Sequence, residues 1–109
     1  MANRYKNANF DLTTTAVTDI YTVPSNSRAI VQNIHIANVG AGNHEIKAFI
    51  YDDSATRSYQ FAEHTVNSGN SKSVADGVII LEENDKLQVQ ADTADVFEGT
   101  ASILEFDRT

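Results

Sequence analysis

Residues 28–38 read Arg-Ala-Ile-Val-Gln-Asn-Ile-His-Ile-Ala-Asn, and this stretch decides the fold class. Its isoleucines stand at even positions, and apolar residues with a period of two are typical of a half-buried β-strand. We therefore expect the side chains of Ile30, Ile34 and Ile36 to face a core. Gln32 interrupts this row, while Asn33 and His35 point to the other face. Polar turn residues before and after the stretch predict one complete strand.

The same pattern continues along the chain. Short apolar or alternating segments are separated by Asn, Asp and Gly, which tolerate positive φ and whose side chains can replace ladder hydrogen bonds. The pattern predicts strands over residues 5–12, 19–23, 28–38, 45–52, 57–66, 71–74, 78–81, 86–91 and 96–106. No stretch has the period of a long amphipathic helix. We expect an all-β fold, an antiparallel β-sandwich that is jelly-roll-like with about eight or nine short strands.

Two of these segments are apolar on both faces of the strand. They read Ala48-Phe49-Ile50-Tyr51 and Val78-Ile79-Ile80-Leu81. A two-layer sandwich buries one face of each strand, so the second face needs another cover. This cover could be a folded-back N-terminal arm, such as residues 5–10, or a neighbouring subunit. We expect a single β-sandwich domain over residues 13–109, preceded by an arm or first strand at residues 1–12.

Composition argues against several kinds of partner. The chain of 109 residues has 8 basic and 15 acidic residues, a net charge of −7, and its basic residues are scattered. Nucleic acids and anionic membranes bind basic patches, so neither is an expected partner. The absence of cysteine excludes disulfides and thiolate metal sites. No apolar run approaches about 18 residues, so neither a signal peptide nor a membrane span is expected.

The histidines and the acidic pairs do not form a chemical site in the sequence. His35, His44 and His64 lie in or beside different predicted strands without HxH or HxxxH spacing, so we expect surface or interface histidines and no metal site. The pairs Asp52-Asp53 and Glu82-Glu83 fall in predicted turns. They lack the spacing of a calcium loop and show no sign of the paired carboxylates of a glycosidase.

Nucleotide and serine chemistry have no support either. No GxSxG elbow occurs, and Gly40-Ala41-Gly42 lacks the following helix and lysine of a phosphate-binding loop. We therefore expect no catalytic residue, no cofactor and no enzyme activity.

Two segments resemble motifs of small structural proteins of tailed bacteriophages. Residues 21–38 begin Tyr-Thr-Val-Pro, pass through a polar turn and continue as Ala-Ile-Val-Gln-Asn-Ile-His-Ile-Ala-Asn. Residues 81–91 resemble the Leu-Glu-Glu-Gly-Asp-Lys-Leu turn of that family, with Asn84 in place of the usual Gly, and Asn also suits positive φ. Residues 100–105 resemble its closing strand. The resemblance covers about four-fifths of the chain and leaves residues 1–20 poorly matched.

The resemblance implies a virion structural protein that packs against copies of itself and against neighbouring virion proteins. The preferred role is a capsid decoration (cement) protein on the capsid surface, expected as a homotrimer that bridges subunits of the major capsid protein. A domain this small also gains stability from oligomerisation. The alternatives are a low-copy tail, neck or fibre-associated protein and, from another class, a host-surface glycan-binding module that uses Tyr51 or Tyr59. The candidate interface residues are Tyr5, Phe10, Phe49, Tyr51, Tyr59 and Phe61.

Overall fold

The computed structural model describes residues 2–107. Nine strands form within this range, namely β1 Ala2–Asp11, β2 Thr18–Thr22, β3 Ser27–Asn38, β4 His44–Asp52, β5 Arg57–Val66, β6 Ser71–Ser73, β7 Ile79–Leu81, β8 Lys86–Ala91 and β9 Phe97–Asp107. Each coincides with a strand predicted from the sequence, apart from small shifts at the ends. Within the described range no helix is long and apolar enough to cross a membrane.

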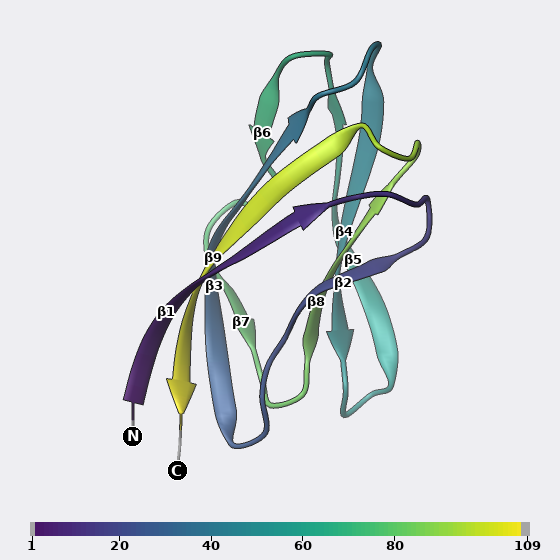
Figure 1. The fold of residues 1–109 in the computed structure, drawn as a ribbon. Helices are drawn as coiled ribbons and strands as arrows, with labels where there is room; N and C mark the ends of the chain where they lie inside the picture. The colour runs from purple at the N-terminus through teal and green to yellow at the C-terminus, as the bar shows by residue number, and fades with distance from the viewer. Residues whose placement is uncertain (1, 108–109) are drawn as a thin grey trace.

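The strands form two antiparallel sheets that pack face to face (Figure 1). The first, which we call sheet A, has the strand order β1-β9-β3-β6, and β7 also pairs with β3. The second, sheet B, has the order β2-β8-β4-β5. This strand order is that of a jelly roll, so the predicted antiparallel, jelly-roll-like β-sandwich is confirmed.

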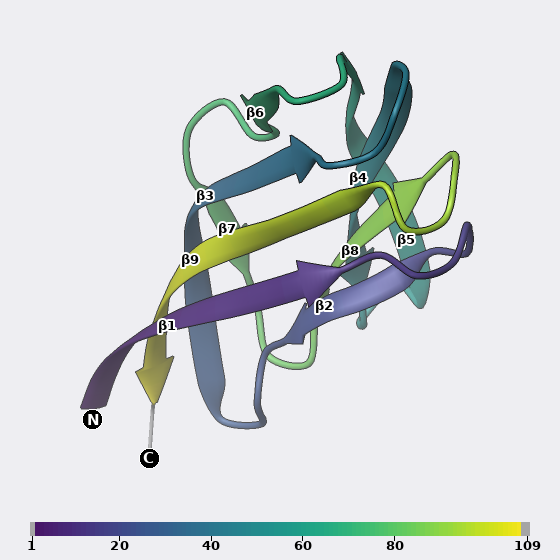
Figure 2. The same ribbon diagram turned by 45° about the horizontal axis from the view of Figure 1, so that its top comes forward.

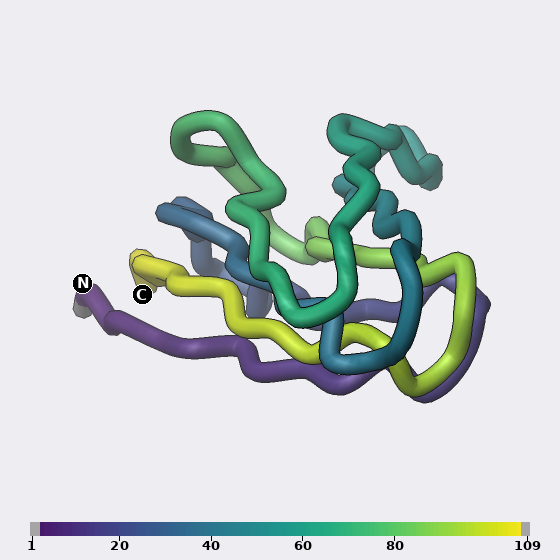
Figure 3. Tube along the Cα trace, turned by 90° about the horizontal axis from the view of Figure 1, so that it is seen from above, coloured from purple at the N-terminus to yellow at the C-terminus, as the bar shows by residue number. Residues whose placement is uncertain are grey.

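β6 and β7 share one strand position beside β3. β6 pairs with residues 35–37 of β3, and β7 pairs with residues 29–31. Figure 3 shows the chain passing from β5 in sheet B to β6 in sheet A, followed by the loop that leads to β7. The interruption leaves sheet A with four strand positions, matching the four strands of sheet B.

The core between the sheets consists mostly of aliphatic side chains. Ile46 and Leu87 from sheet B meet Ile34 and Ile103 from sheet A, and each of these side chains is almost completely buried. Phe97 is the largest fully buried side chain in the described part of the chain. Burying a side chain of this kind stabilises the fold by about 1.5–3 kcal/mol, so the inward faces supply most of the stability.

One expectation is wrong, because β3 contains a β-bulge. The sequence predicts Ile30 on the same face as Ile34 and Ile36, but Ile30 lies between the buried Ala29 and Val31 and points away from the core. Val31 pairs with Ile103 and Asn33 pairs with Ser102, which leaves Gln32 as an extra residue. One extra residue reverses the side-chain alternation, so Ile34 and Ile36 return to the core beyond it.

β1 is an edge strand of sheet A, and it does not cover the outer face of β4. It pairs with β9 along its length, from Ala2 opposite Asp107 to Asp11 opposite Glu98 (Figure 2). Of the two covers considered from the sequence, the folded-back N-terminal arm is therefore not present over sheet B.

The inward face of β1 is fixed by a ring over a glycine. Phe10 lies opposite Gly99 of β9, and a Cβ added to Gly99 would lie 2.5 Å from Phe10 Cζ and from the His35 carbonyl oxygen. An aromatic ring over a strand glycine fills the space that the missing side chain leaves. A glycine is therefore required at this point of the β1–β9 pair.

The turn that closes the β7–β8 connection has the conformation expected from the sequence. Asn84 has a φ of 67°, as predicted for the residue that replaces the usual glycine of the resembling motif. Asn26, in the turn before β3, has a φ of 62°. Asparagine tolerates this left-handed region better than other residues with a side chain, so both turns close without glycine.

Candidate assembly surface

The six aromatic residues proposed from the sequence lie on three strands and in two groups. Tyr5 and Phe10 are on β1, at the edge of sheet A. The other four are on the neighbouring strands β4 and β5 of sheet B, namely Phe49, Tyr51, Tyr59 and Phe61. The strands β4 and β5 are neighbours, but these four residues divide between the two faces of sheet B. Phe49 and Tyr51 lie on the outer face, whereas Phe61 packs against the core and Tyr59 is opposite Ile50, which also packs against the core.

Phe10 and Phe61 pack against the core. Phe10 lies over Gly99, as described above, and Phe61 is the extra residue of a bulge between the pairs Ala48–Ala62 and Phe49–Gln60. Both rings are partly buried from the inward side. Both side chains therefore contribute to packing within the single chain. That they also take part in an interface remains a prediction.

Phe49 and Tyr51 lie half-buried on the outer face of sheet B within a polar hydrogen-bonded layer. Ser58 donates a hydrogen bond to Gln88 Oε1 over 2.7 Å, and Gln88 Nε2 donates one to Asp19 Oδ1, also over 2.7 Å. Gln88 is only 8% exposed although it points outward. The buried Gln88 amide is thereby hydrogen-bonded at both its oxygen and its nitrogen within one chain, as buried polar groups generally are.

Cations lie over the two tyrosines considered for glycan binding. The Arg57 guanidinium carbon is 4.6 Å from the centre of the Tyr59 ring, and Lys86 Nζ is 5.4 Å from the centre of the Tyr51 ring. These are cation–π distances. A sugar stacks on an aromatic face, and in each tyrosine one face is already taken by a side chain of the same molecule.

A second group of apolar side chains lies on the outer face of sheet A. Tyr5 of β1 is opposite Leu104 of β9, Leu104 is opposite Ile30 of β3, and Ile30 is opposite Ile80 of β7. Directly opposed residues of antiparallel strands point to the same face and lie about 5 Å apart, so the four side chains form a continuous ridge. We call these four residues the apolar row. Tyr5 is 78% exposed and Ile80 is 67% exposed.

Of this row, sequence reasoning found only Tyr5 as an interface candidate. It placed Ile30 in the core because the bulge at Gln32 was not anticipated. Ile80 belongs to the doubly apolar segment of residues 78–81, so the signal for an exposed apolar face was present there. Leu104 follows Ile103 directly. Since neighbouring residues of a strand point to opposite faces, such a pair must present one apolar side chain outward.

Two of the three histidines, His44 and His64, have hydrogen-bond contacts with the rest of the chain. His44 Nδ1 lies 3.2 Å from Asp92 Oδ1 and His44 Nε2 lies 2.8 Å from the Ala41 carbonyl oxygen, while His64 Nε2 lies 3.1 Å from the Val74 carbonyl oxygen. In residues 2–107 no three His, Asp or Glu side chains are grouped closely enough to hold a metal ion. These contacts hold loops and strand ends.

Asp85, at the end of the acidic run 82–85, is buried and organises two loops. Its Oδ1 accepts a hydrogen bond from the Asp53 N–H over 3.0 Å, and its Oδ2 accepts one from the Glu82 N–H over 2.9 Å. A carboxylate that accepts backbone N–H bonds in this way closes a turn. The carboxylate thus joins the turn after β4 to the one before β8.

Glu105 is a buried carboxylate that sequence reasoning missed. It is 2% exposed on the inward side of β9, where Tyr21 of β2 donates a hydrogen bond to its Oε2 over 2.5 Å. Lys6 Nζ of β1 lies 3.2 Å from the same oxygen. Burial and the hydrogen bond and negative charge of Glu105 raise the pKa of Tyr21 far above its usual value. The carboxylate ties the edge strands of both sheets to β9.

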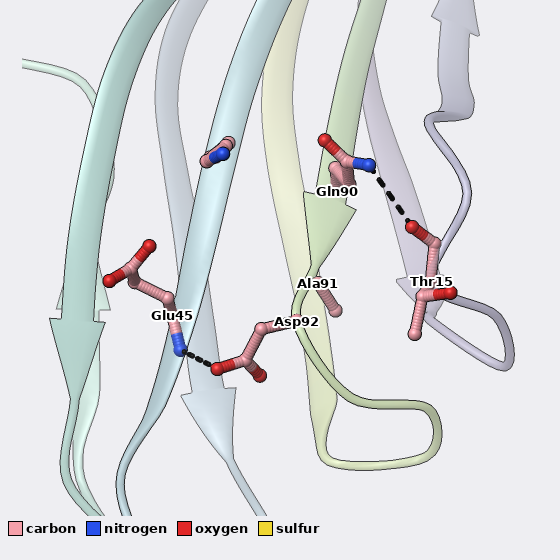
Figure 4. Close-up of a pocket in the computed structure, with 6 residues that line it drawn as sticks. Thr15, Glu45, Gln90, Ala91 and Asp92 are labelled. Atoms are coloured by element: carbon pink, nitrogen blue, oxygen red, sulfur yellow. Dashed lines mark hydrogen bonds between the residues drawn. The ribbon is translucent and has the colours of Figure 1, made fainter.

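A shallow hollow of about 270 Å³ lies on the outer side of sheet B (Figure 4). Gln90 Nε2 donates a hydrogen bond to the Thr15 carbonyl oxygen over 3.1 Å, and the Glu45 N–H donates one to Asp92 Oδ2 over 3.0 Å. A hydrogen bond to Glu63 raises the pKa of the Glu45 carboxyl. The Gln90 amide and the Asp92 carboxylate are thus bound to backbone groups at the hollow, and the lining residues form no nucleophile–base pair.

The strand order and the buried core show that the described chain is a jelly-roll β-sandwich, and the apolar row is exposed on the outer face of its sheet A. A scan against protein-family models and a search of curated proteins gave no match.

Solved structures with a similar fold come from viral and bacterial assemblies. The capsid structure of Helicobacter pylori bacteriophage KHP30 contains a chain 14% identical, with a TM-score of 0.59 and coverage of 100% of this chain and 90% of that chain. A Bacillus endospore appendage, from a family of disulfide-linked pili, is 12% identical with a TM-score of 0.59 and coverage of 99% and 88%. A chain of infectious bursal disease virus, Gx strain, is 10% identical with a TM-score of 0.60; the match covers 95% of this chain and 31% of that one. At such identities the likeness establishes the fold.

Proposed function

We propose that this chain is a non-enzymatic structural protein of a bacteriophage virion, and that it serves as a capsid decoration (cement) protein. The observation that carries the proposal is the apolar row on the outer face of sheet A. Large apolar side chains lined up on a sheet and exposed to water are unfavourably solvated in a free monomer, and a covering partner removes that cost. A domain whose exposed apolar surface is organised in this way is suited to assembly.

The comparisons and the sequence support the same class of assembly. The likeness to the chain in the KHP30 capsid structure extends over nearly the whole of both chains. A domain of this fold and size therefore occurs in a phage capsid, which supports the proposed role. The resemblance of residues 21–38 and 81–91 to small phage structural proteins points in the same direction. In the proposed role the protein binds copies of itself and sits between subunits of the major capsid protein. Its acidic surface keeps it soluble before assembly.

Quantitative mass spectrometry of purified virions of the phage that encodes the chain tests this proposal. A copy number close to that of the major capsid protein is the expected result, because a decoration protein is distributed over the whole head. A ratio of a few per cent would replace this role with one in the neck, tail or fibres. Absence from the particle would overturn the virion assignment.

A further inference from the structure

The outer face of sheet A carries few charges on either side of the apolar row. The next residues along the strands in one direction are Asn3, Phe106 and Arg28. In the other direction come Asn7, Ser102 and Asn33, followed by Asn9, Thr100 and His35. Asp11 and Glu98, the acidic residues that β1 and β9 place on this face, lie opposite each other at its far end. Glu82, which follows β7, is exposed and lines a hollow together with Arg28 at the other end.

This charge distribution bears on which partner fits. Two copies of a chain with a net charge of −7 repel each other unless they meet over a surface with few carboxylates. The outer face of sheet A is such a surface over most of its length, and at the end where Glu82 lies, Arg28 supplies a positive charge beside this carboxylate. The face is therefore suited to a second copy of the chain.

We propose that the outer face of sheet A is a contact between two copies of this chain, related by a two-fold axis that runs along the strands between β3 and β9. Such an axis places β9 of each copy over β3 of the other, and β1 over β7. Leu104 then meets Ile30 of the second copy, and Tyr5 meets Ile80 of the second copy. Strands of stacked sheets commonly align within about 30°, as this arrangement requires.

The rows beside the apolar row also match in this arrangement. Arg28 meets the ring of Phe106 of the second copy, and a guanidinium over an aromatic ring is a favourable contact. Glu98 meets Ala37 of the second copy, so no two carboxylates are brought together. Polar residues face polar residues in between, Ser102 opposite Asn33. The face is thus self-complementary: the apolar row meets the apolar row of the second copy, polar residues beside it meet polar residues, and no two carboxylates meet.

The face is also large enough for such a contact. β9 has 11 residues and sheet A has four strand positions. At about 3.3 Å per residue and about 4.8 Å between strands, the face projects over roughly 600–700 Å². A standard interface removes about 800 Å² of accessible surface from each partner, and the accessible area of a surface with side chains exceeds its projection.

This inference deepens the proposed function by naming the partner of the apolar row, and it rests on that function only in treating the face as an assembly surface. It also replaces the homotrimer expected from the sequence with a two-fold dimer, which two copies of one self-complementary face form and close. The dimer and the virion assignment are measured independently. A dimer of a protein that is absent from virions would leave this inference intact and remove the proposed function.

The first test is the mass of the full chain in solution, measured by analytical ultracentrifugation. We expect a particle of twice the 11.9 kDa of one chain. The change Ile80→Lys should weaken association at least about tenfold, because it places a charge in the apolar row, where Ile80 meets Tyr5 of the second copy, and a two-fold axis repeats this change on both sides of the contact. Lysine lowers the net negative charge, so greater overall repulsion does not account for this result.

The matched control is Val17→Lys. Val17 is 44% exposed in the connection between β1 and β2, away from the outer face of sheet A, so the control should dimerise like the natural chain. Circular dichroism checks that both variants are folded. A monomer at every concentration, a trimer mass, or equal effects of the two lysine changes would each contradict the proposal.

The orientation is tested by cross-linking, which the cysteine-free chain makes simple. Proteins carrying Tyr5→Cys and Ile80→Cys are mixed and treated with a short bismaleimide that bridges the roughly 10 Å between stacked sheets. We expect cross-linked heterodimers from the mixture and little product from either variant alone. Efficient cross-linking between two Tyr5→Cys chains would show that β1 of one copy lies over β1 of the other, and would overturn the proposed axis.

Discussion

Tyr21 illustrates how one buried hydrogen bond connects the two sheets. Its hydroxyl lies on β2 of sheet B, and the Glu105 carboxylate that accepts its hydrogen bond lies on β9 of sheet A. The carboxylate also pairs with Lys6 of the edge strand β1. A carboxylate with this degree of burial requires its partners, because removing one leaves charge without compensation in a region of low dielectric. We expect this cluster to be a main contributor to the stability of the β1 edge.

The raised pKa of Tyr21 leads to a prediction for alkaline solutions. Burial and Glu105 keep Tyr21 protonated in the folded chain, whereas an unfolded tyrosine ionises near pH 10. The stability that Tyr21 contributes is therefore fully present below about pH 10 and is lost as the pH rises toward the folded value, at about 1.4 kcal/mol per pH unit. Tyr21→Phe should cost about 1 kcal/mol at neutral pH, and the advantage of the natural chain should vanish by about pH 11. Urea unfolding of the natural chain and of Tyr21→Phe at a series of pH values measures both free energies of unfolding. If their difference does not change between neutral pH and about pH 11, the prediction is wrong.

Gly99 gives a second prediction at the level of a single residue. Gly99→Ala should lower the free energy of unfolding by about 1–3 kcal/mol, because the new Cβ overlaps the Phe10 ring and the His35 carbonyl oxygen, each 2.5 Å away. Adding Phe10→Leu should recover part of this loss, so the two changes together should cost less than the sum of their separate costs. Thermal or urea unfolding of the two single variants and the double variant provides the measurement. Additive costs would show that the ring does not restrict this position.

The strands could be predicted from the sequence because Asn, Asp, Gly and Pro separate nearly all of them, and the jelly-roll-like sandwich follows from their number and length. It was harder to predict which face of each strand points to the core. Whether Ile30 points inward depends on the bulge at Gln32, and a bulge is decided by the pairing of β3 with β9, about 70 residues further along the chain. The apolar row was hidden for the same reason. Its members come from four strands, so their alignment is a property of the register rather than of any local segment.

The bulge itself can be tested by deleting one residue of β3. Removing Gln32 restores regular pairing with β9 and keeps Val31 inward and Asn33 outward, so we expect a loss of no more than about 1 kcal/mol. Removing Ile30 shifts Gln32 to the buried position opposite Ile103, and an unpartnered amide there should cost about 2 kcal/mol or more in addition to the lost apolar contact. Urea unfolding of the two deletion variants compares them directly. Equal losses would mean that Gln32 is not the residue that absorbs the extra length.

The two outer faces of the sandwich differ in what a single chain leaves unsatisfied. On sheet B the Ser58–Gln88–Asp19 hydrogen bonds form a polar layer that is complete within one molecule. On sheet A the apolar row crosses a surface of mostly uncharged side chains. Because the chain as a whole carries a net charge of −7, two copies repel each other, and we expect them to meet only over a surface with few carboxylates. Two opposed contributions therefore decide whether the proposed dimer forms: burial of the apolar row favours it, and repulsion between the two acidic molecules opposes it.

These two terms respond differently to salt, which allows a test on the whole molecule. Raising the ionic strength from about 0.01 M to about 1 M shortens the screening length from about 30 Å to about 3 Å. The repulsion between two copies is then largely removed, while burial of apolar surface is not weakened. We expect the dimer to become several-fold tighter with added NaCl, as measured by sedimentation, and the Ile80→Lys variant to remain weaker than the natural chain throughout. A dimer that dissociates as NaCl is added would mean that ion pairs between the copies, rather than the apolar row, hold it together.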